Sequence, residues 1–99
     1  MTVTVLALTT PRPGGEMALQ SYLDVVGPLM QAAGARLVSR HSVADTLAGT
    51  IPARFVSIME YPSEAALRQV FESPAYLALE QIKATAFSQY QVSVLDRFA

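Results

Sequence analysis

The side chains best suited to acid–base chemistry are the single histidine and a hydroxyl close to it in a strand-like segment. A histidine can gain or lose a proton near neutrality, so His41 is the best candidate for a general acid or base. Ser39 lies two positions earlier, and side chains two apart on a strand share one face. We therefore predict that His41 is catalytic and that Ser39 helps to position a substrate. The alternative is a histidine that is hydrogen-bonded to backbone and takes no part in a reaction.

A second strand-like segment, residues 55–61, supplies further side chains for binding a small molecule. Its alternation places two aromatic rings, a hydroxyl and a thioether on one face, namely Phe55, Ser57, Met59 and Tyr61. Strand parity predicts that they line a cavity with Ser39 and His41, and that the opposite set contacts helices: Val56, Ile58, Leu6 and Leu8. Tyr22, on the first predicted helix, is predicted to reach the end of this cavity, with core packing as its alternative.

Two charged side chains of these strands form another candidate pair. Arg40 and Glu60 lie on the strand faces opposite His41 and Tyr61, and we predict an ion pair between them across the hairpin. Arg36 is an alternative partner for Glu60. Because a guanidinium can hold a carboxylate through two parallel hydrogen bonds, the functional alternative for this pair is anion binding.

The composition argues against metal and nucleotide cofactors. The chain has no cysteine and one histidine, and Asp24, Asp45 and Asp96 are separated without a metal-ligand spacing. Pro13-Gly14-Gly15 is typical of a turn rather than of a phosphate-binding loop. We expect no cofactor and no metal.

These side chains must be positioned by two strand–helix–strand halves, residues 3–43 and 54–98. In the first half, the run Val3–Thr9 is rich in β-branched residues and predicts a central strand that is covered on both faces. A helix follows from Glu16, with an apolar stripe at Leu19, Leu23, Val26, Met30 and Ala33.

A proline and a glycine predict where the helix of this first half bends and where it ends. Pro28 predicts a bend within the helix rather than its end, and Gly34 is placed to end it. A strand is predicted from Arg36 to about Val43. The segment Ala44–Ala53 then predicts a long hairpin loop.

The second half repeats this order. Residues 55–61 are predicted to form a strand. Ser63 is predicted to cap a helix whose buried side carries Leu67, Val70 and Phe71. Ser73 is predicted to cap a further helical piece that begins at Pro74. The alternation from Tyr90 to Phe98 predicts the last strand.

The order βαββαβ with right-handed crossovers predicts an α+β fold, the ferredoxin-like sandwich, in which both helices cover one face of a four-stranded antiparallel sheet. Residues 1–99 are expected to form this single domain. The chain is 52% hydrophobic and 15% charged, against roughly 25% charged in an average soluble protein. Because the strands are apolar on both faces, we predict that the uncovered face packs against a second copy, giving a homodimer with a shared cavity.

Charge and hydropathy patterns exclude other partners. Seven Lys and Arg against eight Asp and Glu give a net charge of −1, and no basic cluster is present to follow nucleic-acid phosphates. No apolar run reaches the roughly 18 residues of a membrane span. The first residues lack the basic start and cleavage site of a signal peptide, so we expect a cytoplasmic location and no membrane partner.

Several short patterns, in their order and spacing, resemble the DUF1330 family over roughly residues 22–98. They are Tyr22, Pro28, Gly34-Ala35-Arg36, Arg40, the segment from Arg54 to Tyr61 with Pro62-Ser63, and Ser73-Pro74-Ala75-Tyr76. The resemblance implies a ferredoxin-like subunit of the dimeric α+β barrel superfamily and a barrel-forming homodimer. Related barrels include cofactor-independent monooxygenases, polyketide cyclases, haem proteins similar to chlorite dismutase, and muconolactone isomerases.

The chain departs from the family pattern at three places. It has Ala35 where the family has a second glycine, His41-Ser42 where the family has Gly-Gly, and Lys83 where the family has arginine. A titratable side chain thus replaces glycine in the predicted cavity, which favours a specialised branch of the family.

Together these patterns favour a small-molecule-binding homodimer that acts as a cofactor-independent enzyme. The expected ligand is apolar or aromatic, for example polyketide-like, and the expected chemistry is proton transfer, as in a cyclase or isomerase. A cofactor-independent monooxygenase is a variant. A non-catalytic ligand-binding or accessory protein is the alternative from another class, and a structural dimer with a filled barrel is the third.

Overall fold

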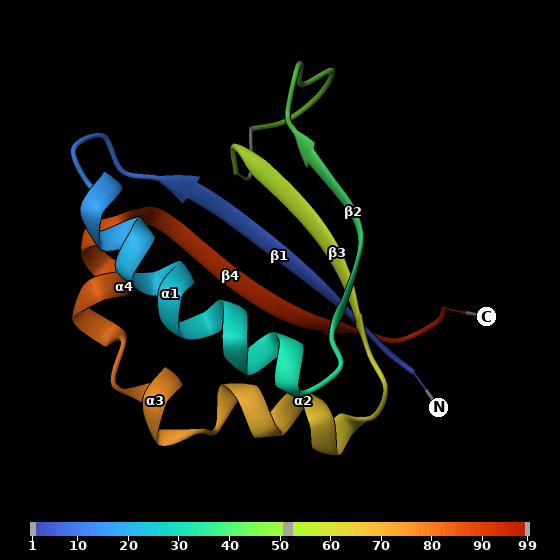
Figure 1. Ribbon diagram of the computed structural model, residues 1–99. Coiled ribbons are helices and arrows are strands. Elements are labelled where there is room, and N and C mark those ends of the chain that lie inside the picture. Colours follow the sequence, from blue (N-terminus) through green and yellow to red (C-terminus); the bar gives the residue numbers. More distant parts are fainter. Residues whose placement is uncertain (1, 51–52, 99) are drawn as a thin grey trace.

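The computed structural model describes residues 2–50 and 53–98. Its strands are β1 (Val3–Pro11), β2 (Arg36–Ser42), β3 (Phe55–Tyr61) and β4 (Phe87–Leu95). They form one antiparallel sheet in the order β2-β3-β1-β4. The helices are α1 (Glu16–Ala32), α2 (Glu64–Phe71), α3 (Pro74–Leu77) and α4 (Glu80–Ala86), and they cover one face of the sheet (Figure 1). This is the ferredoxin-like α+β fold that the sequence predicts.

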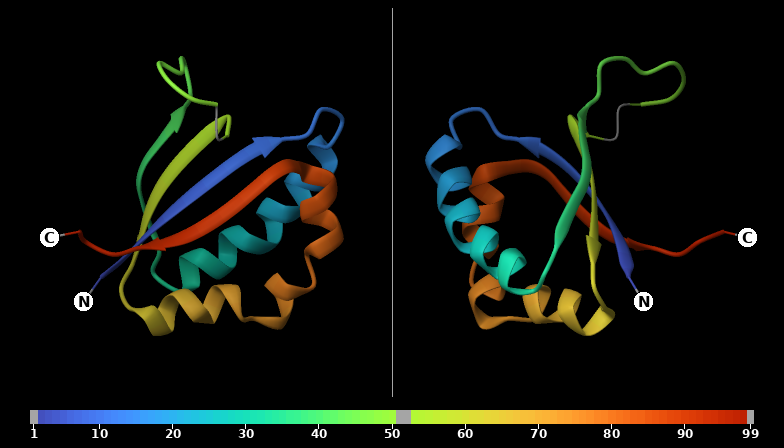
Figure 2. Two further views of the ribbon diagram at one scale, coloured as in Figure 1. Left: turned by 180° about the vertical axis from the view of Figure 1, so that it is seen from behind. Right: turned by 45° about the vertical axis from the view of Figure 1, so that its right-hand side comes forward.

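The second sheet face is open in the described part of the chain, because all the helices lie on the other side (Figure 2). The loop between β2 and β3 projects away from both layers. It corresponds to the predicted connection Ala44–Ala53, of which residues 51 and 52 lie outside the described residues.

Helix α1 continues through Pro28, as predicted, and ends before Gly34. The φ of Gly34 is 76°, a left-handed conformation that glycine adopts without a Cβ clash. The buried side of α1 differs from the predicted stripe, because Tyr22 is buried whereas Leu23 is 48% exposed. The Tyr22 ring packs edge-on against Phe87, with ring centres 5.3 Å apart, and this contact turns the aromatic side chain toward the sheet.

The first two helices of the second half, α2 and α3, begin at the predicted serine caps. The hydroxyl of Ser63 accepts a hydrogen bond from the Ala66 amide, and that of Ser73 accepts one from the Tyr76 amide. The predicted broken pair is a set of three pieces, α2, α3 and α4. Leu67 and Val70 are buried on α2, as the stripe predicts.

The last strand begins and ends three residues earlier than predicted. Helix α4 ends at Ala86, and Phe87 enters extended backbone at once with its ring buried in the core. Strand β4 ends at Leu95, and Phe98 is fully exposed. The alternation from Tyr90 to Phe98 could not set these limits, because the core contacts of Phe87 decide where pairing with β1 starts.

Strand β2 carries a β-bulge that decides which side chains share a face. Leu37 lies opposite Met59 and Ser39 lies opposite Ile58, so Val38 is an extra residue between two regular pairs. Directly opposed residues of neighbouring strands point to the same side of a sheet. Beyond the bulge, Arg40 therefore shares a face with Ser57, and His41 shares the other face with Val56.

Among the described residues, none of the helices has the length and apolar character needed to cross a membrane.

Candidate functional site

The sheet face beneath the helices carries the odd-numbered residues of β1 and β3. Val5 and Tyr61 are buried there against Leu67 and Val70 of α2. Strand alternation extends this face to Phe55, Ser57 and Met59. The prediction that Leu6, Leu8, Val56 and Ile58 contact the helices is therefore wrong, because alternation places them on the open face.

Two of the predicted site residues are separated from the others by the sheet itself. Ser39 pairs with Ile58 and the exposed His41 pairs with Val56, so both belong to the open face. The predicted grouping on one face assumed regular alternation along β2, and the bulge at Val38 reverses it. A catalytic role for His41 stays a prediction.

The same bulge determines which arginine forms the ion pair with Glu60. Glu60 lies directly opposite Arg36, and these two side chains are paired through Arg36 Nη2 and Glu60 Oε1. The predicted pair between Arg40 and Glu60 is wrong, because the two residues lie on opposite faces. The alternative that the sequence offered, Arg36, is the partner.

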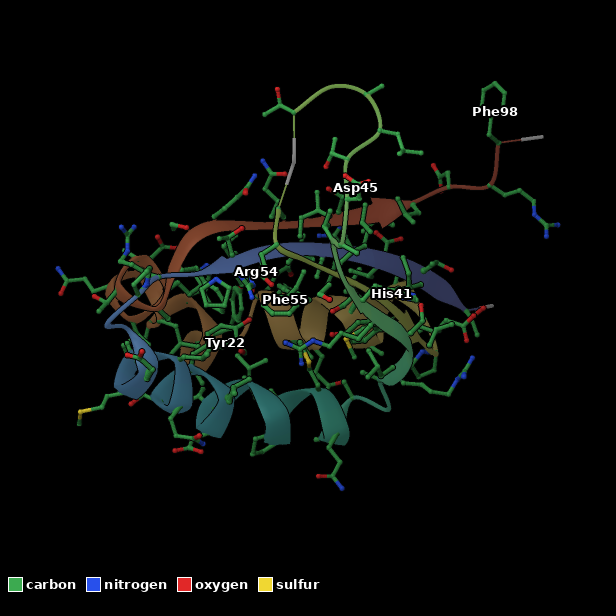
Figure 3. All side chains as sticks on the ribbon, turned by 90° about the horizontal axis from the view of Figure 1, so that it is seen from above. Tyr22, His41, Asp45, Arg54, Phe55 and Phe98 are labelled. Atoms are coloured by element: carbon green, nitrogen blue, oxygen red, sulfur yellow. The ribbon has the colours of Figure 1, made fainter. Side chains whose placement is uncertain are left out.

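A cavity of about 150 Å³ lies between α1 and the helix-facing side of the sheet. Of the predicted site residues, four line it: Tyr22, Ser57, Met59 and Tyr61. Tyr22 points from α1 toward the sheet (Figure 3). Phe55 is not part of the lining, and its ring lies beside Arg40 instead. A largely apolar space of this size holds one aromatic ring, as an engineered cavity of about 150 Å³ does for benzene.

All four tyrosines of the chain gather beside this cavity, although they come from four different elements. The hydroxyl oxygens of Tyr22 and Tyr90 lie 2.6 Å apart, and those of Tyr76 and Tyr90 lie 2.8 Å apart. Tyr61 adjoins the group through Phe71, whose ring centre lies 6.4 Å from that of Tyr61 and 4.8 Å from that of Tyr76. We call these four side chains the tyrosine cluster.

Lys83 donates a hydrogen bond to the tyrosine cluster and places a positive charge beside it. Its side chain is only 16% exposed, and its ammonium lies 3.3 Å from the Tyr76 hydroxyl. It also lies over the rings of Tyr76 and Tyr90, 4.6 and 4.9 Å from their centres. Because an ammonium only donates, Tyr76 accepts a hydrogen bond from it. The hydroxyls of Tyr76, Tyr90 and Tyr22 continue this series of hydrogen bonds as far as the cavity that Tyr22 lines.

Tyr61 has an unsatisfied hydroxyl. The residue is 1% exposed, lines the cavity, and its hydroxyl has no hydrogen-bond partner among the described residues. Burying a polar group in this state costs about 1–3 kcal/mol, so each such group calls for an explanation. An acceptor inside the cavity would satisfy it.

Burial keeps the phenols of Tyr22, Tyr61 and Tyr90 in their protonated form. Loss of contact with water raises the pKa of Tyr22 and of Tyr61 to about 12, and it also raises the pKa of Tyr90. The nearby phenols add to the rise at Tyr61 and Tyr90, because two phenolates would repel each other. At neutral pH these groups therefore donate hydrogen bonds and do not remove protons.

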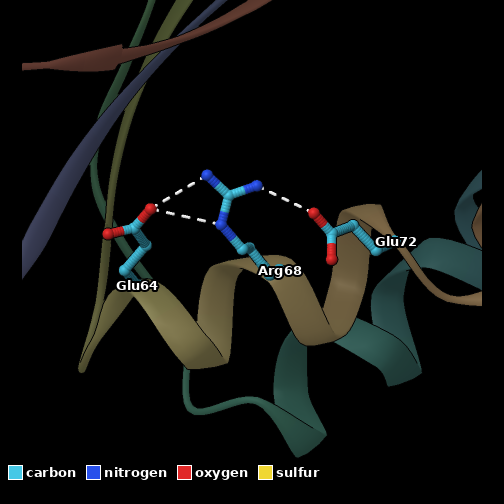
Figure 4. Close-up of polar contacts among 3 residues, drawn as sticks. All are labelled: Glu64, Arg68 and Glu72. Atoms are coloured by element: carbon cyan, nitrogen blue, oxygen red, sulfur yellow. Dashed lines mark hydrogen bonds and ion pairs between the residues drawn. The ribbon is translucent and has the colours of Figure 1, made fainter.

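A wider hollow of about 950 Å³ lies between α2 and the ends of β1 and β4. Its charged wall includes Arg68, which is held between two carboxylates (Figure 4). The guanidinium binds Glu64 on one side and Glu72 on the other, at 2.9 and 2.8 Å. Since these charges satisfy one another at the surface, the tyrosine-lined cavity is the better candidate site.

Sequence reasoning named Tyr22 and Tyr61 but missed Tyr76, Tyr90 and Lys83. Lys83 was noted only as a departure from a family pattern, and Tyr76 and Tyr90 as periodic residues of a helix and a strand. Both are tyrosines, and a buried tyrosine needs a hydrogen-bond partner for its hydroxyl. This residue type was therefore a signal in the sequence that could have indicated the cluster. Within residues 2–50 and 53–98, no group of three or more His, Cys, Asp and Glu side chains could hold a metal ion.

Comparison with known proteins gives a family and a fold. The family model for a domain of unknown function, DUF1330, matches residues 7–98. No curated protein matches the chain. Among solved structures, RPA0582, a protein of unknown function from Rhodopseudomonas palustris, is 22% identical, with 99% of this chain and 83% of that one covered and a TM-score of 0.78.

Two further solved structures share this fold. Rv0793 from Mycobacterium tuberculosis is 26% identical, with 100% of this chain and 97% of that one covered and a TM-score of 0.63. A dimeric protein of unknown function with a ferredoxin-like fold, from Bacteroides fragilis, is 11% identical, with 97% and 96% covered and a TM-score of 0.56.

Proposed function

The chain belongs to the DUF1330 family, and we propose that it is a homodimeric, cytoplasmic protein that binds one small apolar or aromatic molecule in the cavity between α1 and the sheet. The ligand carries a carbonyl, enol or phenol oxygen. The observation that carries this proposal is the buried, unpartnered hydroxyl of Tyr61 in the wall of a largely apolar space.

The tyrosine cluster supports proton-transfer chemistry on such a ligand. A ligand oxygen would accept hydrogen bonds from Tyr61 and Tyr22, which both line the cavity. When a neighbouring C–H bond passes its proton to a water molecule, its electron pair forms the enolate double bond and the negative charge moves to that oxygen, where fixed donors stabilise it. The Lys83 ammonium, linked through Tyr76 and Tyr90, adds positive charge behind these donors. The proposed activity is a cofactor-independent isomerase or cyclase, with a monooxygenase acting through the same stabilised anion as a variant.

The tyrosines that line the cavity do not act as the base. Burial raises the pKa of Tyr22 and Tyr61 to about 12, so both keep their protons at neutral pH. His41 keeps its proposed acid–base role in a second space, between the open sheet faces of two subunits, where Ser39 lies beside it.

A non-catalytic ligand-binding or accessory protein is the second candidate. The raised pKa values of Tyr22 and Tyr61 favour it, because they supply donors without supplying a base. Turnover separates the two candidates, since both bind the same kind of ligand.

The proposal is tested first by binding and then by turnover. Phenol is titrated into the full chain and followed by calorimetry, with 1-naphthol as a two-ring comparison. Phenol is expected to bind more tightly, because two rings exceed a cavity of about 150 Å³. Tyr61→Phe should weaken phenol about tenfold, whereas the control Tyr76→Phe, which lies outside the lining, should have less effect. Absence of phenol binding to the folded chain would overturn the proposal.

Turnover is measured as the isomerisation of cyclohex-3-enone to its conjugated isomer, cyclohex-2-enone. This reaction reports proton transfer on a ketone with one ring. Loss of turnover in Tyr61→Phe with His41→Gln unaffected places the chemistry in the cavity. The opposite result places it at the open face. Binding without turnover supports the accessory protein.

A further inference from the structure

One charged side chain lines the tyrosine-lined cavity, and its charge has no counterpart there. Arg40 lies opposite Ser57 on the helix-facing side of the sheet, and every other lining residue in the described chain is uncharged. Neither a hydrogen bond nor an ion pair joins the side chain of Arg40 to another described residue, whereas Arg36 is paired with Glu60 and Arg68 with two glutamates.

The placement of Arg40 follows from the bulge at Val38. With regular alternation Arg40 would lie on the open face and Ser39 would face the helices. The extra residue reverses the two and places Arg40 on the cavity side of the sheet. Arg40 is exposed on the edge strand β2, so its charge stands in water beside the cavity and is free to meet an anionic group of a ligand.

The ring of Phe55 supports the guanidinium at this place. The Arg40 guanidinium carbon lies 5.6 Å from the centre of that ring, and the Arg54 guanidinium carbon lies at the same distance. Arg54 does not line the cavity. The cavity thus has hydrogen-bond donors at the tyrosine cluster and a positive charge at Arg40, with apolar walls between them.

We infer that the cavity accepts a monocyclic aromatic or enolic carboxylate, with its carboxylate bound by Arg40 and its hydroxyl or oxo group bound by Tyr61 and Tyr22. This inference rests on the proposed function and names the class of its ligand. A planar carboxylate matches the guanidinium through two parallel hydrogen bonds. The volume of about 150 Å³ limits the ligand to one ring.

The test compares para-hydroxybenzoate, benzoate and phenol by calorimetric titration of the full chain at one ionic strength. We expect para-hydroxybenzoate to bind at least about tenfold more tightly than phenol, since charge-assisted pairs are the strong ones. Arg40→Gln should abolish this advantage, so that para-hydroxybenzoate binds no more tightly than phenol, and Arg40→Lys should keep part of it. Arg54→Gln is the matched control, since it removes the same charge beside the same ring but outside the lining, and it should change binding less than about twofold.

The outcomes separate this inference from the function on which it rests. If phenol binds and the carboxylate adds nothing, the inference fails and the proposed function stands. Equal loss in Arg40→Gln and Arg54→Gln overturns the inference too, because it indicates general attraction rather than a contact. Tighter binding of phenyl phosphate than of benzoate overturns the assignment to carboxylates. If neither phenol nor para-hydroxybenzoate binds to the folded chain, the proposed function fails and the inference fails with it.

Discussion

The hydroxyl oxygens of Tyr22 on α1 and Tyr90 on β4 lie 2.6 Å apart, although 68 positions separate the two residues in the chain. Tyr90 is also hydrogen-bonded to Tyr76, so it joins the first helix, the last strand and the short helix α3. Its substitution therefore tests the tyrosine cluster as a unit.

Tyr90→Phe is expected to lower the free energy of unfolding by about 1–3 kcal/mol, because it leaves the buried hydroxyls of Tyr22 and Tyr76 without their shared partner. Tyr22→Phe removes one hydrogen bond and should cost less. Urea denaturation at a fixed protein concentration measures both. Equal stability of Tyr90→Phe and the unaltered protein would contradict the described cluster.

Alkaline pH should destabilise the fold through the phenols of Tyr22 and Tyr61. The ordinary pKa of a tyrosine is 10.0, and burial raises the pKa of both residues to about 12. A group whose pKa is raised by folding contributes stability below its unfolded pKa and loses that contribution as the pH rises through its folded pKa. We expect full stability below pH 10 and progressive loss between pH 10 and 12.

The phenolate absorbance of the folded protein provides the direct readout of this pH dependence. It should lag behind that of the urea-unfolded chain. Coincident titration curves would show that these hydroxyls are not buried.

Lys83→Met should destabilise the protein by about 1–2 kcal/mol, because it removes a donor to Tyr76 and a cation over two rings. The matched control is Glu80→Gln. Glu80 is the exposed partner of Lys83, with a separation of 3.5 Å, and its loss should change stability by less than about 0.5 kcal/mol. Thermal unfolding distinguishes the two variants, and a larger effect of Glu80→Gln would assign the role of Lys83 to the surface ion pair.

Ile58→Glu tests the proposed homodimer. Ile58 lies between Leu6 and Ser39 on the open sheet face, and a carboxylate buried there without a partner would oppose face-to-face packing. We expect the unaltered protein to sediment as a dimer at micromolar concentration and the variant as a monomer. Leu77→Glu, at a leucine of α3 that is 58% exposed, should remain dimeric. A monomeric mass for the unaltered protein removes the homodimer from the proposal.

The elements of the fold were predictable because their signals are local. The hydroxyls of Ser63 and Ser73 bind amides three residues away, and Gly34 adopts a backbone conformation that depends on its own lack of a Cβ. The strand and helix order followed from these stops and from periodicity. The start of β4 was missed by three residues, because the burial of Phe87 depends on contacts with α1 that lie far away in sequence.

The candidate site was predictable only in part. Tyr22, Ser57, Met59 and Tyr61 were named and do line the cavity. Their predicted association with Ser39 and His41 failed through one unpaired residue, Val38, because a bulge exchanges the two faces for everything beyond it. A bulge forms when two strands pair, so the alternation of residues along β2 alone does not predict it.

By itself, then, the sequence determined the α+β architecture, the ends of most elements and the polar types available for chemistry, since capping, turn formation and periodicity act over a few residues. Tertiary structure decided which side chains meet. It turned Arg40 toward the cavity and His41 away from it, and it brought four tyrosines and Lys83 together from separate elements. Register and packing are properties of paired segments, so the contacts that define the site exist only in the folded chain.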